Sequence, residues 1–132
     1  MGTQFLNVDL VIRARFDLSA LVKLLEERGL PCIDGPTAKG RYWSATFETS
    51  LTRPTLARAT DEFLKVIEGL EAEDRQLWDR CLKKELDFGY ECQGDQFASA
   101  HIISNDLIKR IGRTGASVRT TIYRSTPPEG IS

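Results

Sequence analysis

Apolar and polar residues alternate along four stretches of the chain, at residues 5–16, 41–49, 84–91 and 117–124. Successive side chains of a strand point to opposite faces of a sheet, so alternation is typical of a strand with one buried face and one wet face. Strands that are buried on both faces carry continuous apolar runs instead. We therefore predict a sheet that is covered mainly on one face and is built on these four strands.

Apolar residues recur at helical spacing between the strands. The first helix is predicted to begin after Asp17, which can cap it, and to end at Gly29. The last helix is predicted to begin after Ser104 and to end at Gly115, directly before the final strand. These two helices each lie between a strand and a glycine stop.

The middle of the chain predicts one bent helix or two helices, over residues 54–82. Trp78 falls on the apolar stripe of this segment, and Trp43 alternates in phase with inward residues of its strand, so both are predicted to pack in the core. Residues 31–41 are predicted to form a loop. Residues 96–103 are predicted to form a strand or the edge of one.

This order of elements predicts an α+β fold, with a ferredoxin-like, antiparallel-rich sheet and helices packed mainly on one face. A shift of 86 residues superposes Leu21–Lys23 on Leu107–Lys109 and Gly29 on Gly115, so a duplication of two halves stays open. We predict one domain over residues 1–126. Residues 127–132 are polar and proline-rich, and we expect them to form a flexible tail.

Charge and cysteine content narrow the function classes. Eighteen basic residues against nineteen acidic ones give a net charge of −1, which removes the bulk electrostatic argument for a nucleic-acid binder or an anionic-membrane binder. No run approaches the roughly 20 apolar residues of a membrane span, and the first residues do not match a signal peptide. Three cysteines without close spacing then predict free thiols and a cytoplasmic location.

Several short runs resemble a known family. They are Gly29-Leu30-Pro31, Gly40 with Trp43, and the closing residues Ile103-Ser104, Leu107, Ile111, Gly115-Ala116 and Ile122-Tyr123. Together they are similar to the bacterial proteins catalogued as domain of unknown function 4279, over most of the chain. The resemblance implies a small soluble bacterial α+β domain, and it brings no assigned activity and no catalytic residues.

Catalytic chemistry has one candidate centre in the sequence. His101 is the single histidine, and a histidine acid or base needs an orienting partner and a pocket. Asp87, Glu85 or Glu91 on the neighbouring strand could supply the carboxylate, and we predict that a small enzyme or a small-ligand site would use His101 with Asp87 and Tyr90. No CxxC or HxxxH spacing is present, so we predict neither a metal nor a cofactor.

The other hypothesis is a non-enzymatic interaction or regulatory module that binds a protein partner or a second copy of itself as a homodimer. Alternation places charged side chains and tyrosines together on the face that helices leave open, a mixture that interfaces favour. A nucleic-acid partner is not expected, because no RNP-like sequence accompanies the basic residues. The predicted binding face consists of Asp9, Arg13, Arg15, Tyr42, Glu48, Asp87, Arg119 and Tyr123.

Overall fold

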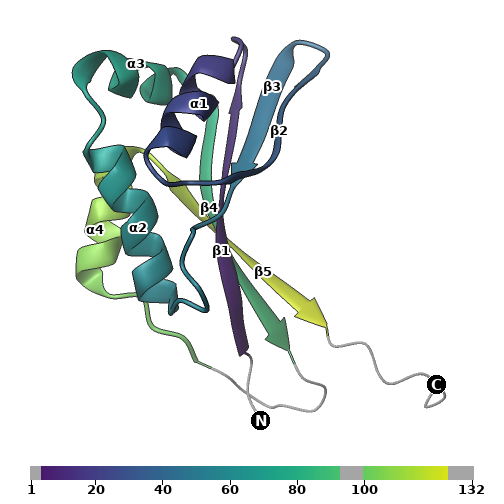
Figure 1. Ribbon diagram of the computed structural model, residues 1–132. Helices are drawn as coiled ribbons and strands as arrows, with labels where there is room; N and C mark the ends of the chain where they lie inside the picture. Colours follow the sequence, from purple (N-terminus) through teal and green to yellow (C-terminus); the bar gives the residue numbers. More distant parts are fainter. Residues whose placement is uncertain (1–3, 93–99, 125–132) are drawn as a thin grey trace, which may run out of the picture.

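The computed structural model describes residues 4–92 and 100–124, and Figure 1 shows their arrangement. The strands are β1 (Gln4–Ala14), β2 (Cys32–Lys39), β3 (Tyr42–Phe47), β4 (Lys83–Cys92) and β5 (Ser117–Arg124). The helices are α1 (Ser19–Glu27), α2 (Leu56–Glu68), α3 (Ala72–Arg80) and α4 (Asn105–Thr114). The predicted tail lies outside the described residues.

One five-stranded sheet runs in the order β2-β3-β1-β4-β5. The pairs β2–β3, β3–β1 and β1–β4 are antiparallel, whereas β4 and β5 are parallel. The helices lie together on one side of the sheet (Figure 1). The protein therefore combines helices with a sheet that contains both antiparallel and parallel strand pairs. The parallel pair arises because α4 carries the chain back along the sheet, so that β5 runs in the same direction as β4.

The four predicted strands are present, but the predicted loop at residues 31–41 is wrong, because Cys32–Lys39 forms β2. This strand lies at an edge of the sheet, and its pairing with β3 shifts register twice, on either side of Asp34. Bulges of this kind break the alternation on which the other strands were predicted. The strand predicted at 96–103 lies outside the described residues over 96–99, and residues 100–103 are not in a strand.

The core lies between the sheet and its helical cover. Every second residue of β1 from Val8 to Ala14 is buried, as the alternation predicts. Phe47 of β3 and Phe88 of β4 flank this row, and Phe63 of α2 is fully buried. Burying these apolar side chains stabilises the fold by roughly 25 cal/mol per Å² of apolar surface removed from water.

Trp78 joins α3 to the end of α4. Its side chain is 0% exposed, which confirms the predicted core position, and its Nε1 donates a hydrogen bond to the Thr114 carbonyl at 2.7 Å. Arg75 donates from one guanidinium nitrogen to the Arg113 carbonyl at 3.0 Å. The last carbonyls of a helix have no partner within the helix, so α3 supplies donors to the C-terminus of α4.

Three predicted helix boundaries are confirmed by local geometry. The Ser104 hydroxyl accepts a hydrogen bond from the Leu107 amide at 3.2 Å, and Gly115 ends α4 with a φ of 81°. Gly29 follows α1 with a φ of 98°, in the same left-handed region. A side chain is strained in that region, so glycine is favoured at both stops. Each glycine leads into an edge strand, β2 or β5.

Candidate functional site

The face of the sheet opposite the helices carries the residues predicted from the alternation. In the register, Asp9 of β1 lies beside Asp87 of β4, which lies beside Arg119 of β5. Tyr123 follows on the same face of β5, where it lies beside Gly89: a Cβ built on that glycine would be 3.6 Å from the tyrosine ring. We call this face the open face. The strand register places six of the predicted residues on it, namely Asp9, Arg13, Tyr42, Asp87, Arg119 and Tyr123. Arg15 and Glu48 directly follow β1 and β3, and they lie near Tyr42 and Asp9 of this face.

Two arginines lie close to a tyrosine on the part of the open face where β1 and β3 pair. The guanidinium carbon of Arg13 lies 4.8 Å from the ring centroid of Tyr42, and that of Arg15 lies 5.9 Å from it. Both distances are within the range of a cation–π interaction, which is worth roughly 0.5–1 kcal/mol at an exposed site. This part of the face presents positive charge over an aromatic ring.

Carboxylates gather at the middle of the open face. Partial burial raises the pKa of Asp9, and the neighbouring charges of Asp87 and Glu48 raise it further. Asp9 accepts a hydrogen bond from the Asn7 amide at 3.2 Å, and Asp87 accepts one from the Thr121 hydroxyl at 2.7 Å. The middle of the face is therefore acidic and hydrogen-bonded within the chain.

Ion pairs satisfy the charges next to β5. Arg119 donates from Nε to the Glu85 carboxylate at 2.5 Å, and Lys83 lies 3.8 Å from the same carboxylate. Arg119 of β5 thus forms an ion pair with Glu85 of β4. A phosphate backbone would have to compete with these carboxylates, which argues against the open face as a nucleic-acid site.

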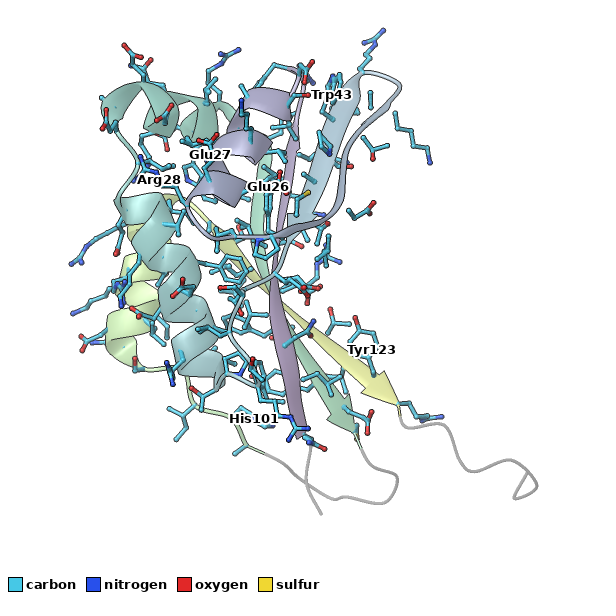
Figure 2. All side chains as sticks on the ribbon, in the orientation of Figure 1. Glu26, Glu27, Arg28, Trp43, His101 and Tyr123 are labelled. Carbon is cyan, nitrogen blue, oxygen red and sulfur yellow. The ribbon has the colours of Figure 1, made fainter. Side chains whose placement is uncertain are left out.

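The structure does not bring His101, Asp87 and Tyr90 of the predicted pocket together. The rings of His101 and Tyr90 lie 4.2 Å apart between centroids, with 41° between their planes. Tyr90 points toward the helices and is buried, whereas Asp87 bonds Thr121 on the open face. Residues three apart on a strand point to opposite faces, so Asp87 cannot orient this histidine. Figure 2 shows His101 at the end of the sheet near the start of β1.

A second surface, which the sequence did not indicate, lies where α4 meets β5 on the helix side of the sheet. It is a groove of about 410 Å³ with an almost wholly apolar lining. Ile108 of α4 is 54% exposed there, and Val118 and Ile122 of β5 are 45% and 63% exposed. The groove is lined by Ile103, Ile108, Ile111, Gly112, Ala116 and Val118.

The two edges of the sheet differ in how well they are protected. On β2, two register shifts, Pro36 and the charged Asp34 and Lys39 interrupt the edge. These are the devices that keep an edge from pairing with another chain. β5 also carries two charged residues, Arg119 and Arg124, but it pairs with β4 over its whole length without a register shift, and it has neither proline nor glycine. Valine, isoleucine and threonine fill four of its eight positions, which favours extended backbone.

Within the described residues there is no group of three or more histidine, cysteine, aspartate or glutamate side chains placed to hold a metal ion. None of the helices in that part of the chain is long and apolar enough to cross a membrane. Comparisons with protein-family models, with curated proteins and with solved structures give no match to this chain. The resemblance to the bacterial family therefore stays a prediction.

Proposed function

We propose that this chain is a non-enzymatic protein-interaction domain, and that it binds through the β5 edge together with the apolar groove beside it. We also propose that its first four strands form a ferredoxin-like core: the order β4-β1-β3-β2 is antiparallel throughout, and α4 with β5 is an addition at one edge. In this proposal β5 is the strand added to the ferredoxin-like core, and it carries the binding surface.

The observation that carries this proposal is the regular edge of β5, which no register shift, proline or glycine interrupts. An edge strand presents a row of backbone donors and acceptors, and an added strand gains main-chain hydrogen bonds along it. Val118 and Ile122 supply exposed apolar side chains on one face of this edge. Arg119 and Tyr123 supply polar and aromatic contacts on the other, which suits the polar rim of an interface.

The alternative of a small enzyme or ligand site around His101 receives no support from this geometry. The ring of His101 lies tilted against the ring of Tyr90, which is buried on the helix side of the sheet, whereas Asp87 of the predicted pocket lies on the open face. That the domain is bacterial rests on the family resemblance, and the proposed cytoplasmic location rests on the three unpaired cysteines.

The test compares capture of proteins from a lysate of the source organism by three forms of the chain. Ile122→Lys puts a charge on the β5 edge, and Ile33→Lys puts the same charge at an exposed position of the β2 edge, where Ile33 is 49% exposed. We expect proteins held by the wild type and by Ile33→Lys to be lost with Ile122→Lys. Equal capture by all three folded forms would refute the proposal.

A further inference from the structure

We propose that the occupant of the β5 edge is a second copy of this chain, paired antiparallel through β5, with Thr120 opposite Thr120 of the second copy. This inference rests on the proposed function and specifies its partner. The two five-stranded sheets would become one continuous sheet, with all helices on the same side. Symmetric pairing of this kind is the commonest way in which soluble chains associate.

Symmetry restricts the register. In an antiparallel pair, residues that lie opposite each other point to the same face. A two-fold axis perpendicular to the sheet keeps the helices of both copies on one side, and it passes midway between one residue and its equivalent in the second copy. Within Ser117–Arg124, only centres at Thr120 or Thr121 allow seven residues of each copy to pair.

The side chains choose between these two registers. With Thr120 at the centre, Val118 lies opposite Ile122 of the second copy, and the same contact occurs twice by symmetry. With Thr121 at the centre, Val118 would instead lie opposite Arg124 of the second copy. Val118 and Ile122 are both exposed in the single chain, so the first register buries apolar surface where the second would bring a charge.

Charge also allows the Thr120 register. Arg119 would lie opposite Thr121 of the second copy, so no two arginines face each other directly. Each Arg119 already bonds Glu85 within its own chain, which neutralises the guanidinium near the axis. A register centred on Arg119 would place like charges directly opposite, which destabilises a strand pair.

The groove continues the contact. Val118 belongs both to the strand edge and to the groove lining, so Ile122 of the second copy would lie beside the groove entrance. Ile108, more than half exposed in the single chain, lines the same groove. Pairing would thus bring the two apolar grooves together into one continuous apolar surface. This surface would form the water-excluding centre of the interface, between the paired β5 strands and the two α4 helices.

The experiment combines sedimentation velocity with cysteine cross-linking of the full chain. We expect the wild type and Ile33→Lys to form dimers, and Ile122→Lys to raise the dimer dissociation constant about tenfold or more, a change of about 1.4 kcal/mol. Thr120→Cys should form a disulfide with its own equivalent under mild oxidation, because opposite residues have the 4.4–6.8 Å Cα separation that a disulfide needs. Peptide mapping by mass spectrometry distinguishes this bond from one that involves a native cysteine.

Thr121→Cys is the matched control, since in the proposed register its two copies are diagonal rather than opposite. Cross-linking of Thr121→Cys that equals or exceeds that of Thr120→Cys would overturn the register. A wild type that stays monomeric at all concentrations would overturn self-pairing. If the wild type is monomeric but Ile122→Lys loses other proteins that the wild type captures, the proposed function still stands. If the wild type is monomeric and Ile122→Lys captures the same proteins as the wild type, the proposed function fails as well.

Discussion

Truncation of Trp78 to alanine is expected to destabilise the fold by roughly 3–5 kcal/mol, the range for removing a buried aromatic ring and leaving a cavity. The ring is 0% exposed, and its Nε1 donates to the Thr114 carbonyl at the end of α4. The variant loses both the apolar contacts and this hydrogen bond. A loss of this size is a large part of the about 5–15 kcal/mol by which a domain is usually stable.

A graded set of variants separates the two contributions. Trp78→Phe keeps most of the apolar ring but removes the donor, so the Thr114 carbonyl is left buried without a partner, at a cost of about 1–3 kcal/mol. Leu82→Ala is the control, because Leu82 follows α3 in sequence but is exposed. A surface substitution of this kind changes stability by about 0.5 kcal/mol or less.

Urea unfolding followed by circular dichroism measures the free energy of unfolding of each variant by linear extrapolation. The expected order of destabilisation is Trp78→Ala, then Trp78→Phe, then Leu82→Ala close to wild type. If Trp78→Ala unfolds at the same urea concentration as Leu82→Ala, then α3 does not hold the end of α4, and the description of this packing is refuted.

Asp9→Asn is expected to stabilise the fold at neutral pH by about 0.5 kcal/mol, because partial burial and the like charge of the neighbouring Asp87 both disfavour an ionised Asp9. Because the pKa of Asp9 is raised in the folded state, its ionisation destabilises the fold only as pH rises above the pKa of the unfolded carboxyl group. The stabilisation by Asp9→Asn should therefore vanish in acid. An equal stabilisation at pH 3 and at pH 7 would contradict this. Arg110→Gln should cost about 1 kcal/mol at pH 7, as a charge network at the surface does. Arg110 bonds the α2 carboxylates of Asp61 and Glu68 and lowers the pKa of both, so the loss of stability in Arg110→Gln should shrink as pH falls through their folded pKa values. Thermal melts at several pH values measure this loss. A thiol count on the denatured, unreduced protein should find all three cysteines free. In the native protein Cys81 should react slowest with a thiol reagent, because burial raises the pKa of its thiol to about 11. Rapid labelling of Cys81 would contradict its buried position.

Local chemistry explains which elements the sequence predicted. The alternation of β1 and β4 comes from one buried face, and it located both strands and their residues on the open face, such as Asp9 and Asp87. Ser104 and Gly115 were identified as helix ends because a hydroxyl cap and a left-handed glycine act through neighbouring residues alone. Features that depend on a few adjacent residues are available to sequence reasoning.

The missed features depend on residues far apart in the chain. β2 carries Asp34, Gly35 and Pro36 and has little burial, so it is held as a strand by pairing with β3 rather than by its own composition. The exposure of Val118 and Ile122 follows from where α4 ends its cover of the sheet. Alternation places these two residues on the helix side, but it does not tell how far the helices extend over β5.

Amide hydrogen exchange of β5 as a function of protein concentration tests the β5 edge most directly. Pairing would protect the outward amides of Ser117–Arg124 at high concentration, and dilution below the dimer dissociation constant would remove that protection. The outward amides of β2 should exchange at the same rate at both concentrations. Exchange of the β5 amides that does not change with concentration, or protection that develops on β2 instead, would contradict the assignment of β5 as the pairing edge.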